Sequence, residues 1–184
     1  MATDLVKRIA AHVEKRLKND ISGHDWFHIS RVWQLAKYLQ STEGGNSELI
    51  EAAALLHCAA EHDLRSAQRD TMRTYTLMGI LDVLEVEGKI RDGIIEIVQG
   101  SHYKGRDTER PATIEGKIVQ DANFLETLGA VGIARAFTAG GYLGRPIHNP
   151  TTKPLLNASK ETYHQRKREG TSFNYIYEKP LQIT

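Results

Sequence analysis

The spacing of the apolar residues constrains the fold of this chain more than any other feature. They recur every three or four positions along almost the whole sequence, as in Leu5, Ile9, Val13 and Leu17, with Lys and Glu between them. This period places apolar side chains on one face of a helix. No alternating run of β-branched residues is long enough to indicate a strand. We therefore predict an all-α fold, a helical bundle whose helices cover about residues 5–17, 22–39, 48–58, 66–87, 89–100, 108–128 and 129–139.

The turns between these helices are marked by their own residues. Ser22, with Asp25 three residues later, resembles a capping box and predicts the start of the second helix. The Gly- and Pro-bearing stretch 140–154 predicts a long loop, followed by one or two short helices. The segment 48–58 is rich in helix formers and nearly free of charge, so we expect a buried central helix with His57 at its inner end.

The composition sets modest bounds on function. A chain of 184 residues is an ordinary size for one domain, and we expect a single domain over residues 1–184. Its 24 basic and 23 acidic residues nearly cancel, so charge does not indicate a nucleic acid duplex as partner. One cysteine excludes an internal disulfide, and no stretch approaches the roughly 18 apolar residues of a membrane span. With no signal peptide at its start, the sequence predicts a cytoplasmic protein without a membrane partner.

Several polar residues have the spacing of a metal site. His24 and His28 are four residues apart and share a helix face, as do His57 and Glu61. On spacing alone, such a pair is more often a pair of surface residues or of helix-end residues than a metal site. Asp121 lies in an apolar helical segment, where a buried carboxylate needs either a metal or an ion pair, for which Arg135 and Lys117 are the candidates.

Four blocks in this order resemble the HD-domain superfamily of metal-dependent phosphohydrolases, and in particular its small stand-alone bacterial and archaeal members. The resemblance covers about residues 20–140 and implies an HD-domain helical bundle with a metal-centred cleft. The blocks are residues 23–32 (GHDWFHISRV), 51–57 (EAAALLH), 115–122 (EGKIVQDA) and 129–137 (GAVGIARAF).

The resemblance also implies roles for individual residues. His28, His57 and Asp121 match metal ligands, and the metal would be Mn²⁺, Fe²⁺, Mg²⁺, Ni²⁺ or Zn²⁺. Glu61 matches an acidic residue that orients or deprotonates the attacking water. The candidates for binding the substrate phosphate are the cations Lys104 and Arg135, together with His24. For both cations, a solvated surface position or a salt bridge is an equal alternative.

Cys58 departs from the family pattern, because it occupies the place of the aspartate in the His-Asp doublet. Sulfur is a poor ligand for Mg²⁺ or Mn²⁺ but binds Zn²⁺ or Fe²⁺ as thiolate. Cys58 is therefore either a ligand that alters the metal preference or a small buried apolar residue at a site that has lost its metal. A nucleophilic role for Cys58 is disfavoured, because adjacent residues on a helix point roughly 100° apart and His57 would not reach it.

These features predict a metal-dependent phosphohydrolase that acts on a phosphate ester or phosphoanhydride, with a nucleotide as the favoured small phosphorylated substrate. The alternative is a catalytically impaired ligand-binding or interaction protein that has lost its metal through Cys58. Apolar helix faces permit a homodimer without requiring one. Similar proteins continue through another helix after the point where this chain stops, so we also expect the C-terminal packing to differ.

Overall fold

The computed structural model describes residues 2–59 and 69–183, except for the side chains of residues 69–73, 167 and 168. Within these ranges the chain forms helices and no β-strand, which confirms the all-α prediction. None of these helices has the length and apolar character that crossing a lipid bilayer demands. The helices are α1 (Asp4–Leu17), α2 (Trp26–Glu43), α3 (Ser47–Leu56), α4 (Arg69–Val83), α5 (Gly88–Gly100), α6 (Ile114–Leu125), α7 (Gly129–Tyr142), α8 (Lys160–Glu169), α9 (Ser172–Glu178) and a short 3₁₀ helix at Pro180–Gln182.

Two helices begin later than the sequence predicts. Helix α2 starts at Trp26 and not near Ser22, because the side chain of Asp25 accepts the backbone N–H of His28 and so caps the helix itself. Helix α6 starts at Ile114 and not at 108. Here the hydroxyl of Thr113 accepts the backbone N–H of Gly116 at 3.1 Å and closes the first turn.

The chain divides into two compact units. The first comprises residues 1–20, 24–101 and 110–123, and the second comprises residues 21–23, 102–109 and 124–184. Each unit is described by itself below. The single domain expected over residues 1–184 stays a prediction.

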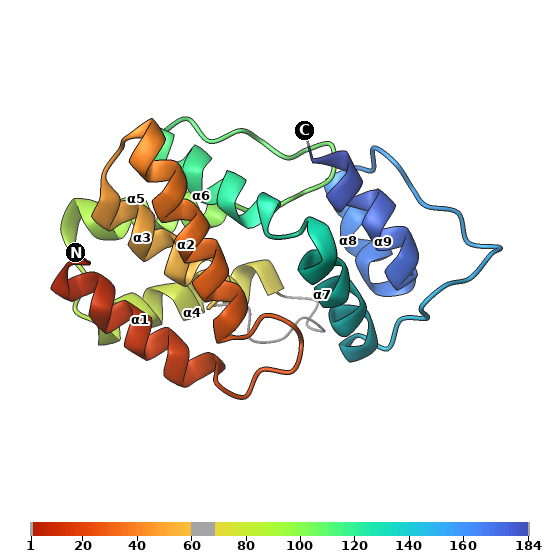
Figure 1. Ribbon diagram of the computed structural model, residues 1–184, viewed down its shortest axis with the longest axis horizontal. Helices are drawn as coiled ribbons and strands as arrows, with labels where there is room; N and C mark the ends of the chain where they lie inside the picture. Colours follow the sequence, from red (N-terminus) through yellow and green to blue (C-terminus); the bar gives the residue numbers. More distant parts are fainter. Residues whose placement is uncertain (1, 60–68, 184) are drawn as a thin grey trace. The chain divides into compact units, whose positions relative to one another are not determined.

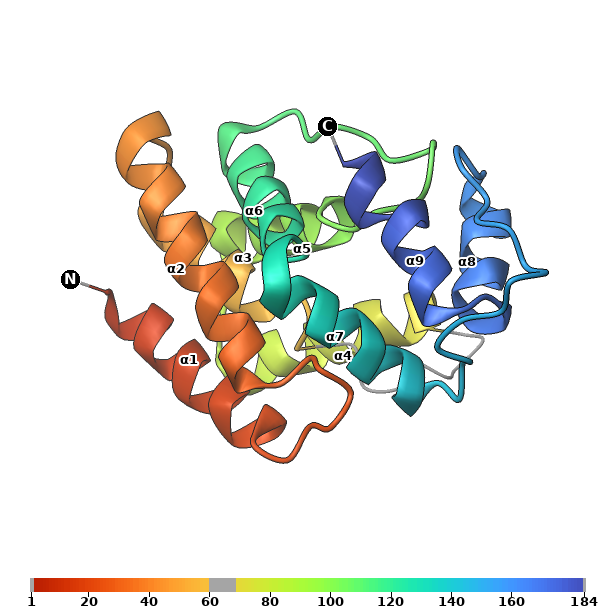
Figure 2. The same ribbon diagram turned by 45° about the vertical axis from the view of Figure 1, so that its right-hand side comes forward.

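Helix α3 is the centre of the first unit. It contacts α1, α2 and α5, and Figures 1 and 2 show α2 running alongside it. Every residue from Ile50 to Leu56 is buried, which confirms the predicted central helix. Leu55 and Leu56 are fully buried, and burying a side chain of this kind contributes roughly 1.5–3 kcal/mol. The end of α3 is therefore held firmly in the core.

A polar contact also joins α2 to α3. The indole Nε1–H of Trp33 on α2 donates to Oε2 of Glu51 on α3 at 2.9 Å. Glu51 is nearly buried, so this hydrogen bond satisfies a carboxylate that is costly to bury unpaired. The contact joins α2, which carries His28, to α3, which ends just before His57.

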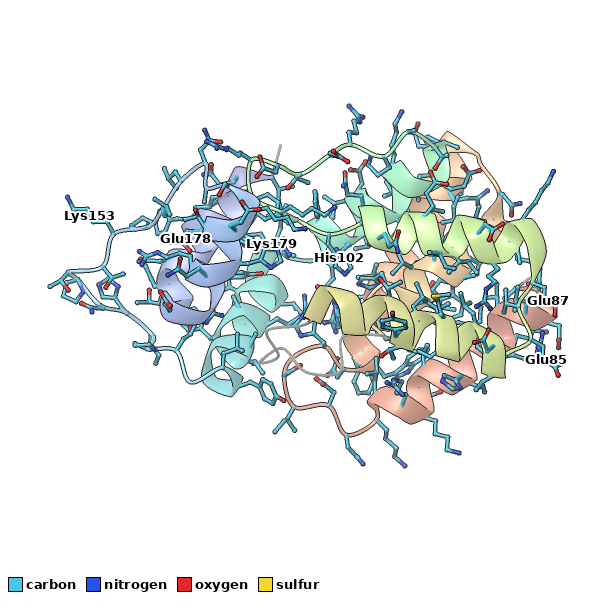
Figure 3. All side chains as sticks on the ribbon, turned by 180° about the vertical axis from the view of Figure 1, so that it is seen from behind. Glu85, Glu87, His102, Lys153, Glu178 and Lys179 are labelled. Carbon is cyan, nitrogen blue, oxygen red and sulfur yellow. The ribbon has the colours of Figure 1, made fainter. Side chains whose placement is uncertain are left out.

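The second unit packs α7 against α9, with the 3₁₀ helix following α9. The predicted loop after residue 140 is present and extends to the start of α8. Figure 3 shows Lys153 on this loop and Glu178 on α9. The backbone N–H of Leu155 donates to Oε1 of Glu178 at 2.9 Å, and a guanidinium nitrogen of Arg166 donates to the carbonyl of Lys153 at 2.6 Å. These two bonds fasten the loop to α9 and α8.

Candidate metal centre

His57 lies just past the end of α3, as the C-cap residue, and is fully buried. Its Nδ1 lies 2.6 Å from the carbonyl oxygen of Ala54. A carbonyl oxygen only accepts hydrogen bonds, so Nδ1 carries a ring proton, and in the neutral imidazole Nε2 then keeps its lone pair. This is the arrangement in which a backbone carbonyl orients a metal-binding imidazole.

His28 lies in the first turn of α2, and its side chain is 1% exposed. The rings of His28 and His57 meet edge to face, with centroids 5.3 Å apart. The ring of His24 also lies next to that of His28, with the two centroids 5.6 Å apart. His24 precedes α2, so the prediction that His24 and His28 share a helix face is wrong, although their rings lie side by side with His28 the more deeply buried of the two.

Cys58 completes a cluster of three donor residues. One ligand atom from each of His28, His57 and Cys58 lies within 4.8 Å of the others, and all three residues are buried. The expectation that His57 does not activate Cys58 as a nucleophile stays a prediction. Both residues lie in the turn after α3, where the backbone of His57 stays helical, and their donor atoms still belong to one group. Both side chains can therefore serve one centre.

This donor set fits a divalent ion. The donors around a tetrahedral zinc ion lie roughly 3.5 Å apart, given metal–ligand distances of roughly 2.0–2.3 Å. The 4.8 Å limit on the cluster is compatible with that separation. Two imidazoles and one thiol suit Zn²⁺ or Fe²⁺ better than Mg²⁺.

Asp121, the predicted fourth ligand, lies on α6 with its side chain exposed, whereas Ile118, Val119 and Ala122 beside it are buried. The predicted burial of this carboxylate is therefore wrong. Partial desolvation still raises the pKa of Asp121 above its ordinary value, and the charge of Arg110 opposes that shift. The oxygens of Asp121 are not part of the three-residue donor group, so its role as a ligand stays a prediction.

Lys104 and Glu61 are the residues predicted to bind substrate phosphate and to activate water. Lys104 is half-buried in the second unit, and its backbone N–H donates to the hydroxyl of Thr108 at 2.8 Å. The tight turn therefore fixes the backbone of Lys104. Glu61, the predicted residue for activating water, lies outside the described residues.

Arg135 on α7 makes structural contacts within the second unit. Its Nε–H donates to the carbonyl of Gly23 at 2.7 Å, and its Nη1 pairs with the carboxylate of Glu126. The side chain of Glu126 is 3% exposed and that of Arg135 is 15% exposed, so this is a buried ion pair. The predicted alternative, an ion pair between Arg135 and Asp121, is wrong. Arg135 pairs with Glu126, which lies in the turn between α6 and α7.

Replacing Arg135 with Met should lower the free energy of unfolding by about 3 kcal/mol, because the replacement leaves the buried carboxylate of Glu126 uncompensated. Chemical denaturation measures this loss. The double variant Glu126→Leu, Arg135→Met should recover part of it, because it removes both charges. A single Arg135→Met variant within about 0.5 kcal/mol of the native protein, as expected for an exposed residue, would contradict the assignment.

Two interactions that support the site were not predicted from the sequence. They are the carbonyl of Ala54, which orients the ring of His57, and the bond from Trp33 to Glu51. The first has no signal in residue identity, because every residue has a carbonyl. The second had a signal, since Glu51 is an acidic residue within an apolar helix and such a residue needs a partner.

Comparison with known proteins places these features in context. No family model matches the sequence. Over 147 residues the chain is 36% identical to YpgQ of Bacillus subtilis, a match that spans 77% of this chain and 69% of YpgQ. The crystal structure of YpgQ in complex with ADP aligns with a TM-score of 0.63 and 29% identity, over 96% of this chain and 80% of that one.

Two further crystal structures are similar to this chain. A protein from Lactobacillus plantarum aligns with a TM-score of 0.83 and 31% identity, over 97% of this chain and 82% of that one. An HD-superfamily hydrolase from Bacillus thuringiensis aligns with a TM-score of 0.61 and 36% identity, over 96% of this chain and 79% of that one.

Proposed function

Because this chain belongs to the HD superfamily, like the Bacillus thuringiensis hydrolase to which it is similar, we propose that it is a metal-dependent phosphohydrolase that cleaves a phosphate ester or phosphoanhydride. The observation that carries the proposal is the buried cluster of His28, His57 and Cys58, which brings two imidazoles and a thiol together.

The cluster residues would hold the divalent ion, with Asp121 as the proposed fourth ligand. When bound, the ion supplies a Lewis acid that polarises a phosphoryl oxygen and lowers the pKa of water. Glu61 would orient the attacking water and take its proton. Lys104 and His24 would donate hydrogen bonds to phosphate oxygens. Arg135 is a weaker candidate for this role, because Glu126 and Gly23 already engage its guanidinium.

A nucleotide is the substrate class we propose. Support comes from YpgQ, whose crystal structure contains ADP. Nucleoside phosphates also suit a site of this kind, because their phosphoanhydride oxygens bind a divalent ion and cationic side chains.

A second candidate function is that of a ligand-binding or interaction protein with little or no turnover. The presence of sulfur in the donor cluster favours it, because a thiol replaces the hard oxygen donor on which Mg²⁺ and Mn²⁺ depend.

Elemental analysis and phosphate release from a panel of nucleoside mono-, di- and triphosphates separate these functions. We expect the native protein to retain a divalent metal and release phosphate or pyrophosphate. The Cys58→Asp variant serves as the matched comparison. Turnover by this variant alone would identify Cys58 as the change that impaired the enzyme. A lack of metal and turnover in both proteins would contradict the proposal. Activity of metal-free protein that iodoacetamide abolishes would instead identify a thiol hydrolase.

A further inference from the structure

We propose that Cys58 is a thiolate ligand that makes this centre select Zn²⁺, a borderline-soft ion, over the hard ions Mn²⁺ and Mg²⁺. This inference rests on the metal centre of the proposed function and specifies which ion the centre accepts.

The position of the sulfur is the first argument. Cys58 is a buried member of the hydrophobic core. Its Sγ also lies in the same donor group as a ring nitrogen of His28 and one of His57. A purely aliphatic packing role requires no such arrangement, whereas a ligand does.

The orientation of His57 is the second argument. The bond from Nδ1 to the carbonyl of Ala54 directs the lone pair to Nε2, as in metal centres where a carbonyl orients the imidazole. The ring lies in the fully buried turn after α3, so its orientation is held by packing as well. His57 is thus prepared to bind an ion together with its neighbour Cys58.

The composition of the cluster is the third argument. Two imidazoles and one thiolate form a set that zinc prefers, whereas Mg²⁺ requires oxygen ligands. Binding breaks the S–H bond of Cys58, forms a sulfur–metal bond and releases one proton to the solvent. The thiolate charge offsets one of the two positive charges of the ion inside this buried site. Cys58 is itself only 6% exposed, which shields the sulfur from solvent oxidants.

Cobalt titration of the metal-free full chain tests this ligand directly. Cobalt bound by thiolate absorbs in the near ultraviolet through sulfur-to-metal charge transfer, whereas its visible bands do not need sulfur. We expect the ultraviolet band in the native protein and its loss in Cys58→Asp and Cys58→Ser, both of which should keep the visible bands. Competition titrations should give a ratio of Zn²⁺ to Mn²⁺ affinity at least tenfold higher in the native protein than in Cys58→Asp. Comparing two proteins is necessary because most sites bind Zn²⁺ more tightly than Mn²⁺.

Each other outcome has a distinct meaning. Cobalt binding to native protein without the ultraviolet band would overturn the inference and leave the metal centre of the proposed function intact. An equal affinity ratio in native and Cys58→Asp protein would also overturn it. Cobalt binding by Cys58→Asp alone would overturn it and favour the impaired protein. A lack of binding in all three proteins, with circular dichroism showing them folded, would overturn both the inference and the proposed metal centre.

Discussion

Replacing His57 with Ala is expected to lower the affinity for a divalent metal by more than the roughly 10–100-fold loss caused by changes around a metal ligand, and to abolish phosphate release. The reason is that His57 is a candidate ligand itself, with Nε2 made available by the bond from Nδ1 to Ala54. Metal affinity is measured by competition with a chromophoric chelator, and activity by phosphate release from the nucleotide panel.

His12 offers a matched control for this variant. It lies on α1 in the same unit, outside the cluster, and its pKa is lowered by burial and by the charges of Arg16 and Lys15. Its ring is therefore neutral at pH 7, as a ligand imidazole must be. His12→Ala should keep native metal affinity and activity. His28→Gln should repeat the His57→Ala result and guards against a loss that comes from misfolding. Folded His57→Ala protein with native metal affinity would exclude His57 as a ligand.

Replacing Gly132 with Ala is expected to lower the free energy of unfolding by about 2–3 kcal/mol, near the upper end of the cost of overpacking. A Cβ added at this position on α7 would lie 2.1 Å from the carbonyl oxygen of Thr127 and 2.2 Å from its carbonyl carbon. These are backbone atoms, so the clash is relieved only by moving the turn between α6 and α7. For a chain of this length, the melting temperature should fall by roughly 4–12 °C.

Gly141 on the same helix is the control. A Cβ there would have no heavy atom within 4 Å. Because Ala is the better helix former, Gly141→Ala should be neutral or stabilising by up to about 1 kcal/mol. Differential scanning calorimetry of both variants gives the comparison. A Gly132→Ala variant as stable as Gly141→Ala would show that the turn yields easily and would contradict the expectation.

The fold was largely predictable from the sequence, because the period of the apolar residues is a local property. Ile50, Leu55 and Leu56 share a segment nearly free of charge, and each is buried in α3 as expected. The errors lie at helix boundaries: the helix predicted over 48–58 ends at Leu56, the helix predicted over 66–87 ends at Val83, and two helices start late. Asp25 was taken for the interior partner of a cap at Ser22, although it is the cap. A short polar side chain competes for several backbone N–H groups, and the sequence does not say which one it reaches.

The candidate site was predictable in part. His28, His57 and Cys58 were named together, and the structure brings their donor atoms together. Asp121 was predicted to be buried, but its side chain is exposed. The reason is that an apolar helix still presents one face to solvent. Arg135 was predicted to contact phosphate. Its ion pair with Glu126 was not predictable from the sequence, because the turn between α6 and α7 is what brings the two side chains together.

The sequence by itself determined the helical class, the central position of α3 and the residue types available for metal binding, because periodicity and chemistry belong to the chain. Only the tertiary structure decided that the sulfur of Cys58 faces the two imidazoles. That outcome depends on the turn after α3, which brings the thiol of Cys58 and the ring of His57 into one donor group although the backbone of His57 stays in the helical region. It also depends on α2 packing against α3, which brings His28 to His57 across 29 residues of chain (57 minus 28). Distances between side chains that are far apart in sequence follow from packing, and packing is not a local property.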